Sequence, residues 1–362
     1  MTDSKFSIGR TPIGFGNPPY VIAELSANHL GDFERAADIV RGAHAAGADA
    51  IKLQTYTADS LTIRSDAEWF QVGEGSPWAG RRLYDLYTEG SMPWEWQQPL
   101  RDLARELGLG FLSTPFDAEA VEFLDGLEVD ALKIASFELV DLELIAAAAS
   151  TGRPLIMSTG MATLEDIDDA VGAAEKAEAI GLVLLRCNSA YPAAQSEMDL
   201  AAIPTMIARW GYPVGLSDHS LGPVAGVTAV ALGACVFEKH TTLSRADGGV
   251  DAGFSAEPKE LAEYVRYTRQ AHETIGQERF GPSPHEATSA IFRRSLFVVE
   301  DIEAGEPFTR TNVRSIRPNA GLAPKELSKI LGRQAAHRVE RGTPLAWDLV
   351  TGTAASVTDS AS

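Results

Sequence analysis

Residues 154–188 read PLIMSTGMATLEDIDDAVGAAEKAEAIGLVLLRCN. They begin and end with short apolar runs, at 154–159 and 181–188, in which apolar and polar residues do not alternate. Such runs are typical of parallel strands that are buried on both faces. Between them, residues 162–179 have helical periodicity, and Thr163 is a suitable N-cap followed by acidic residues in the first turn. The stretch therefore predicts a strand, a helix and a second, parallel strand.

The same pattern recurs along the first three quarters of the chain. Further apolar runs predict strands at residues 20–25, 48–56, 109–115, 129–136, 213–218 and 234–240. Amphipathic helical patterns lie between strands, among them residues 33–47, 93–107 and 258–275. A succession of eight β-α units predicts an α/β fold, a closed (β/α)8 TIM barrel, in preference to an open sheet.

The pattern changes near residue 280. Residues 281–292 are rich in Gly, Pro and small polar residues and are predicted to be a linker. Residues 293–352 contain short strand-like runs with Gly turns, which indicate a small β-rich domain. Residues 353–362 are small and polar, and we expect them to be disordered. A barrel takes about 250 residues, so a barrel over 1–280 and a small appended domain account for the chain.

Composition and charge argue against several classes of binding partner. The net charge of −19 argues against nucleic acid and anionic membrane surfaces. No stretch approaches the roughly 20 apolar residues of a membrane span, and the N-terminus lacks the apolar run of a signal peptide, so we expect a cytoplasmic protein. Cys187 and Cys235 lie in apolar runs and are expected to be buried, reduced thiols. An enzyme with this charge would need a locally positive site for an anionic substrate.

Polar side chains stand at the C-terminal end of almost every predicted strand. Lys52 and Lys133 lie within apolar runs, where an unpaired charge is costly. Two lysines among hydroxyls could hold phosphate and carboxylate groups, although a structural ion pair would also explain them. His219 and His240 end two strands that are neighbours in a barrel and could share a divalent ion. Two hydrogen-bonded rim histidines are the alternative.

Motifs at these strand ends resemble the sialic acid synthase family, strand by strand. They are AELSANHLGDFERA, AIKLQTYTADSLTI, FLSTPFD, LKIASFE, STGMAT, YPA, VGLSDHS and FEKHTTL. SIRPNAGLAP resembles the signature of the family's C-terminal antifreeze-like (SAF) domain. ELSANH and KLQTYTADSLT are most similar to the pseudaminic branch of the family.

The resemblance implies an enzyme that joins phosphoenolpyruvate (PEP) to 2,4-diacetamido-2,4,6-trideoxy-L-altrose. The products are a nine-carbon 2-keto sugar acid and phosphate, released by C–O cleavage. It also implies a divalent ion (manganese, magnesium or cobalt) and a homodimer in which the SAF domain of one subunit caps the barrel of the other. The alternative within the family is N-acetylneuraminate or legionaminate synthesis. A Schiff-base aldolase using Lys133 or Lys52 and a non-enzymatic carbohydrate-binding protein are the alternatives outside it.

The resemblance implies roles for individual residues. The catalytic residues are Glu24, His219 and His240, with the two histidines as metal ligands. The PEP-binding set is Lys52, Thr114, Lys133, Ser136, Ser158 and Ser217. The sugar-binding set is Gln54, Ser189, Tyr191, Asp251 and Arg317 of the partner subunit. Ser189 stands where neuraminate synthases usually carry Asn, which fits the pseudaminic branch.

One connection, residues 57–92, is unusually long and follows a strand, so it would lie on the face where barrel enzymes keep their active sites. Its aromatic residues are Trp69, Phe70, Trp78, Tyr84 and Tyr87. They could form an apolar wall for the methyl groups of a deoxy, acetamido sugar, or they could only pack the loop.

Overall fold

The computed structural model describes residues 6–352. The chain forms two compact units, which separate after Gly276. The predicted domain boundaries at residues 280 and 292 stay predictions, and the predicted disordered tail, residues 353–362, lies outside the described residues. Within the described part of the chain, no helix is long and apolar enough to cross a membrane.

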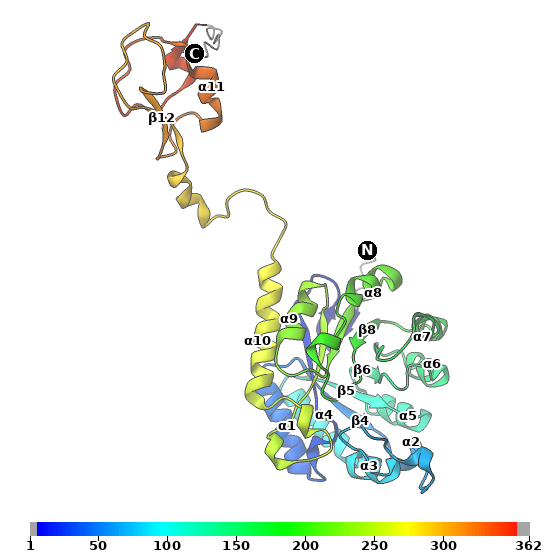
Figure 1. Cartoon of the computed structure of the whole chain (residues 1–362). Helices are drawn as coiled ribbons and strands as arrows, with labels where there is room; N and C mark the ends of the chain where they lie inside the picture. Colours follow the sequence, from blue (N-terminus) through cyan, green and yellow to red (C-terminus); the bar gives the residue numbers. More distant parts are fainter. Residues whose placement is uncertain (1–5, 353–362) are drawn as a thin grey trace. The chain divides into compact units, whose positions relative to one another are not determined.

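The first unit is a closed barrel of parallel strands, as predicted (Figure 1). The strands are β3 (Tyr20–Glu24), β4 (Ala50–Thr55), β5 (Gly110–Pro115), β6 (Ala131–Ile134), β7 (Leu155–Ser158), β8 (Leu182–Cys187), β9 (Val214–Asp218) and β10 (Val236–His240). Each strand pairs with its neighbours in sequence, and β10 closes the barrel against β3. The register at the closure places His240 opposite Glu24, and the next pair places Glu24 opposite Lys52.

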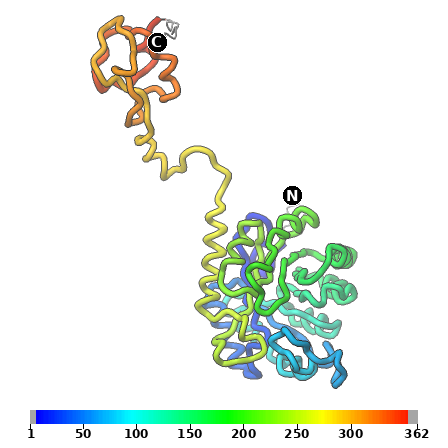
Figure 2. Tube along the Cα trace, viewed as in Figure 1, coloured from blue at the N-terminus to red at the C-terminus, as the bar shows by residue number. Residues whose placement is uncertain are grey.

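Helices follow the strands and cover the outer face of the barrel (Figure 2). They are α1 (Phe33–Ala45), α4 (Gln97–Glu106), α5 (Ala118–Gly126), α6 (Leu142–Ser150), α7 (Leu164–Lys176), α8 (Ala202–Trp210), α9 (Val224–Ala231) and α10 (Pro258–Ile275). The predicted N-cap at Thr163 is confirmed, because its side chain accepts a hydrogen bond from the Asp166 amide. The long connection after β4 contains α2 (Ala58–Leu61) and α3 (Leu83–Gly90).

The barrel interior is apolar at the N-terminal end of the strands. There the hairpin of β1 (Phe6–Ile8) and β2 (Thr11–Ile13) contributes Ile8 and Ile13 to a buried cluster with inward residues of the strands. Further along each strand the inward position, two residues on, becomes polar. The pairs are Ile22 and Glu24, Ala50 and Lys52, Ala131 and Lys133, Ile156 and Ser158, and Val236 and Glu238. The barrel therefore collects its buried polar groups at the C-terminal end of the strands.

The second unit is small and rich in short strands. β11 (Ser295–Val298) pairs with β12 (Val313–Ile316), and β13 (Gln334–Ala335) pairs with β14 (Val350–Thr351), both antiparallel. A short helix, α11 (Leu327–Ile330), joins them. The unit has a separate core, whose fully buried members are Leu296, Val298, Ile302, Phe308, Ile330 and Leu345. The segment predicted to be a linker contains a 3-10 helix over Glu286–Phe292.

Candidate active site

A cavity of about 380 Å³ lies at the C-terminal end of the barrel strands. Eleven of the predicted site residues line it: Lys52, Gln54, Thr114, Lys133, Ser136, Ser158, Tyr191, Ser217, His219, His240 and Asp251. Of the rest, Glu24 is fully buried beside Lys52, Ser189 contacts Ser136, and Arg317 belongs to the second unit. The fold brings these residues together, and their individual roles stay predictions.

Lys52 lies between two buried carboxylates. Its Nζ is 2.8 Å from Glu24 Oε2 and 3.7 Å from Glu238 Oε1, and it donates a hydrogen bond to Thr114 Oγ1 at 2.9 Å. Burial opposes the charged form, but Glu238 and Glu24 outweigh it and raise the pKa of Lys52. Lys52 therefore stays charged, and it combines the ion pair expected of a structural lysine with a place in the cavity wall.

Lys133 is equally buried and has a different environment. Its Nζ donates to Ser158 Oγ at 2.7 Å and to the Ile134 carbonyl oxygen at 2.8 Å, and both partners are neutral. Burial lowers the pKa of Lys133, against the opposing influence of Glu238. A cation whose hydrogen-bond partners are neutral attracts an anionic ligand more strongly than one that is already in a close ion pair. Lys133 is therefore the better anchor for a phosphate or carboxylate group.

His219 and His240 lie side by side, with ring centroids 5.4 Å apart. His219 Nδ1 is 2.7 Å from the Asn188 carbonyl oxygen. Because a carbonyl can only accept, Nδ1 carries the hydrogen, and a deprotonated Nε2 would be free to bind a metal. Burial and the nearby charges of His219 and Lys52 hold the pKa of His240 well below its usual value, so His240 is neutral. Its Nδ1 has no hydrogen-bond partner.

The imidazoles of His219 and His240 fit a divalent cation, on the condition that His219 loses its proton when the cation binds. Burial disfavours the protonated form of His219, but the Cys187 thiol and the Asn188 carbonyl outweigh it and raise the pKa of His219. A cation would therefore displace a proton on binding, as is usual for histidine ligands. Within residues 6–352, no group of three or more His, Cys, Asp or Glu residues could hold a metal. The remaining ligands would have to be substrate or water.

Glu24 is fully buried and is held by polar contacts with residues that line the cavity. Its Oε1 accepts a hydrogen bond from Gln54 Nε2 at 2.9 Å, and the same amide group lies 3.0 Å from Ser26 Oγ. Burial raises the pKa of Glu24 to about 7, although Lys52 opposes the shift. Glu24 can therefore exchange a proton near neutral pH.

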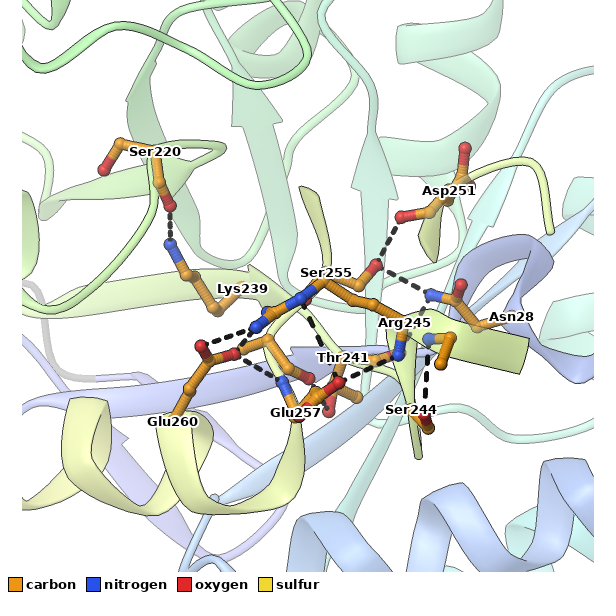
Figure 3. A network of polar contacts seen from close by, with 12 residues as sticks. Asn28, Ser220, Lys239, Thr241, Ser244, Arg245, Asp251, Ser255, Glu257 and Glu260 are labelled. Atoms are coloured by element: carbon orange, nitrogen blue, oxygen red, sulfur yellow. Dashed lines mark hydrogen bonds and ion pairs between the residues drawn. The ribbon is translucent and has the colours of Figure 1, made fainter. Parts of the chain in front are cut away.

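Asp251 is fixed by residues that are far away in the sequence. Its carboxylate accepts hydrogen bonds from Ser26 Oγ and, at 3.4 Å, from the Ala27 amide. Asn28 Nδ2 donates to Ser255 Oγ at 2.8 Å, and Ser255 Oγ donates to the Asp251 carbonyl oxygen at 2.7 Å (Figure 3). These contacts join the segment after β3 to the connection after β10, so the barrel closure positions Asp251.

Ser136 and Ser189 meet in a crowded part of the wall. Their hydroxyl oxygens are 2.9 Å apart. A Cβ atom on Gly160 would lie 2.4 Å from the Ser136 Cβ and 2.7 Å from the Ser189 Oγ. Only glycine fits there, and the Gly160 φ of 33° is also unfavourable for other residues. The backbone after β7 therefore packs directly against both serines.

The remaining predicted sugar contacts are in different units. The Tyr191 ring lies 4.4 Å from the His219 ring, measured between centroids. Arg317 directly follows β12 in the second unit, where its guanidinium carbon is 5.9 Å from the centroid of the Phe292 ring. The role predicted for Arg317 across subunits stays a prediction.

The cavity lining also includes residues that were not among the predicted site residues, and those with acidic or thiol side chains are Glu138, Cys187 and Glu238. Glu238 precedes His240 by two positions on β10 and so points inward as well, a signal that the sequence offered. Glu138 follows β6; burial raises its pKa, and its Oε2 has no hydrogen-bond partner. Cys187 Sγ is 3.9 Å from His219 Nδ1, a contact that no sequence pattern indicated.

The aromatic residues of the long connection have different environments. Trp78 and Tyr87 line the cavity. Trp69 is 87% exposed, and Phe70 and Tyr84 are not part of the lining. Only two of the five aromatic residues therefore offer surface to a ligand in this cavity.

Comparison with known proteins adds an independent finding. Residues 39–280 match the NeuB family, and residues 293–351 match the SAF domain. The chain is 39% identical to pseudaminic acid synthase of Helicobacter pylori, over 91% of this chain and 97% of that one. It is 34% identical to N,N'-diacetyllegionaminic acid synthase of Legionella pneumophila, over 94% of this chain and 97% of that one. It is similar in structure to the N-acetylneuraminic acid synthetase of Leptospira borgpetersenii, with a TM-score of 0.70, 32% identity, and 79% of this chain and 94% of that one covered.

Proposed function

Since the chain belongs to the NeuB family, we propose that it is a pseudaminic acid synthase, which condenses PEP with 2,4-diacetamido-2,4,6-trideoxy-L-altrose. The family resemblance inferred from the motifs is confirmed. The observation that carries the proposal is the convergence of Lys52, Lys133, His219 and His240 on one cavity. Lysines for an anionic ester and imidazoles for a cation occupy the same space, as a condensation of PEP with an aldehyde requires.

PEP would bind through its two anionic groups. Lys133 and Ser158 form one donor pair, and Lys52 and Thr114 form another. Both ammonium groups would stabilise the negative charge of the departing phosphate. These donors would bind the two anionic groups of PEP directly, in a protein whose net charge is −19.

The reaction needs a polarised aldehyde and several proton transfers. C3 of PEP attacks the aldehyde carbon, water adds at C2, and phosphate leaves with cleavage of its C–O bond. A divalent ion such as manganese or magnesium, held by His219 and His240, would supply Lewis acidity at the aldehyde. The pKa values of Glu24, which is buried, and of Glu138, which is half-buried, are both raised, and we propose that these carboxyl groups orient the substrates and carry protons.

The assembly belongs to the same proposal. We propose a homodimer in which the SAF domain of one subunit caps the barrel of the other and supplies Arg317 of the partner subunit. The loops around the cavity expose the large apolar residues Phe137, Val140, Met161 and Leu221, which a covering surface would bury. A cytoplasmic location fits the two buried cysteines, Cys187 and Cys235, which are both free.

Mixing two inactive variants tests the exchanged dimer. Lys133→Met disables a barrel, and Arg317→Ala disables the residue that the cap would supply. In an exchanged dimer of one subunit of each kind, one of the two sites contains neither change, so mixing should restore activity. If Arg317 served the barrel of its own chain, every site in the mixture would carry a defect and no activity would return.

Release of phosphate from PEP with a panel of acetamido sugars tests the activity. We expect fast release with 2,4-diacetamido-2,4,6-trideoxy-L-altrose, slow release with N-acetylmannosamine, and none after EDTA treatment. Faster turnover of the precursor of legionaminate or of N-acetylneuraminate would favour the alternative suggested by the 34% identical legionaminic acid synthase. Activity that is indifferent to EDTA would contradict the metal assignment.

A further inference from the structure

Two loops meet above the cavity at Trp78. The first is the long connection after β4, which contains Trp78, and the second is the connection after β10. The indole Nε1–H of Trp78 donates a hydrogen bond to the Val250 carbonyl oxygen at 2.8 Å. This contact joins residues that are 172 positions apart in the sequence, next to Asp251 in the cavity wall.

Trp78 extends an aromatic surface that begins at the histidines. The Tyr191 ring lies 4.4 Å from His219, and the Trp78 ring lies 5.7 Å from Tyr191. Phe254 packs against all three, at 4.8 Å from Tyr191, 6.4 Å from Trp78 and 6.4 Å from His219. A sugar whose aldehyde lies at the histidines and whose carbon chain follows this aromatic surface would place its far end toward Trp78.

The surface that Trp78 offers to the cavity is apolar. The one polar hydrogen of its side chain is already donated to the Val250 carbonyl oxygen, and the Trp78 backbone amide donates to the Ser76 hydroxyl oxygen. Leu61, Val72 and Leu83 line the cavity from the same connection. A methyl group can be buried there at no polar cost, whereas a hydroxyl group would lose water without gaining a partner from the indole.

We propose that Trp78 is a specificity-determining residue, which selects a sugar with a methyl group over one with a hydroxymethyl group at the end remote from the aldehyde. This inference rests on the proposed function, because it assumes that an acetamido sugar occupies the cavity. The Trp78 ring would contact the methyl group of the sugar directly, and it also packs against Tyr191 and so positions that ring. The hydrogen bond to Val250 holds the ring in place.

The test compares two sugars that differ at one atom: 2,4-diacetamido-2,4,6-trideoxy-L-altrose and its analogue with a hydroxyl group on C6. For the wild type, we expect kcat/KM to favour the deoxy sugar by about 100-fold, the discrimination typical of an apolar pocket against an added hydroxyl. Trp78→Ala should reduce this ratio at least tenfold. Trp78→Phe keeps an aromatic ring but loses the hydrogen bond to Val250. Its kcat/KM ratio should lie between those of the wild type and of Trp78→Ala. The KM for PEP should not change, which separates a local effect from misfolding.

The chain contains a matched control in Trp69, on the same connection but 87% exposed and outside the cavity lining. Trp69→Ala should leave the ratio unchanged. A ratio that stays at the wild-type value in both Trp78 variants, while the deoxy sugar is still turned over, would overturn the role of Trp78 and leave the proposed function standing. If the wild type releases phosphate from PEP with neither sugar, both proposals fall.

Discussion

The N-terminal and C-terminal halves of the barrel interior are built from the same strands but have opposite chemical character. At the N-terminal half, inward residues such as Ile22 and Ile156 are fully buried in an apolar cluster. Two positions further along the same strands, Glu24 and Ser158 are also buried but are charged or polar. Burial stabilises the first half and opposes the charge of the second. The N-terminal half therefore holds the barrel together, while the C-terminal half is kept polar at a cost in stability.

The largest expected effect is on the metal site in the polar half. His240→Ala should abolish turnover and binding of Mn²⁺ and leave the fold intact, because it removes one of the two imidazoles that residues 6–352 contribute to the cavity lining. Mn²⁺ binding by equilibrium dialysis and phosphate release from PEP would measure the two losses. His44→Ala, at an exposed position of α1, is the control and should change neither. Full activity of the His240 variant would refute the metal assignment.

The next effect is on the anion site. Lys133→Met should lower kcat/KM by about 100- to 1,000-fold, the usual loss for removing a group that stabilises developing charge. The Tm should stay the same or rise, because an apolar side chain replaces a buried cation with neutral partners. Phosphate release and thermal unfolding give the two values, with Lys176→Met at an exposed position of α7 as control. A large fall in Tm would mean that Lys133 stabilises the fold, as the apolar half of the interior does.

The apolar half should give the reverse result. Ile22→Ala removes a fully buried side chain from the inner cluster and should cost about 2–5 kcal/mol in the free energy of unfolding. At low temperature its kcat/KM should remain close to that of the wild type, since the cavity lining is unchanged. Urea unfolding would measure the loss, and Ile180→Ala, 59% exposed, should cost almost nothing. Loss of activity without loss of stability would contradict the division of the interior.

The sequence predicted the barrel well because each of its strands is buried on both faces. Residues 129–136, for instance, are predicted as a strand, and β6 occupies Ala131–Ile134. The predicted end residues also converge, since the C-terminal ends of parallel strands share one rim. What the sequence could not give are contacts that depend on closure of the barrel, such as Ser26 with Asp251, which are 225 positions apart.

The same limit applies to the long connection. Trp69 and Trp78 are both aromatic residues in one loop, and nothing local tells them apart. Trp78 lines the cavity and is bonded to Val250, 172 positions away, whereas Trp69 is exposed. A tertiary contact of this length is invisible to periodicity or composition, so the sequence could predict an aromatic wall but not which residues form it.

The pH dependence of Tm should show a small effect of the buried Glu24 carboxyl group in the polar half. Burial raises the pKa of Glu24 from 4.5 to about 7, so the folded state binds its proton more tightly than the unfolded state does. The stabilisation from this proton is complete below about pH 4.5 and is lost as pH rises to about 7. Glu24→Gln cannot ionise, so the Tm of the wild type should fall relative to that of the variant across this range and run parallel above it. Thermal unfolding in EDTA measures the difference, and a constant difference would show that Glu24 keeps an ordinary pKa.

Ile22, two positions earlier on the same strand, has no titratable group, so Ile22→Ala should shift Tm by the same amount at every pH.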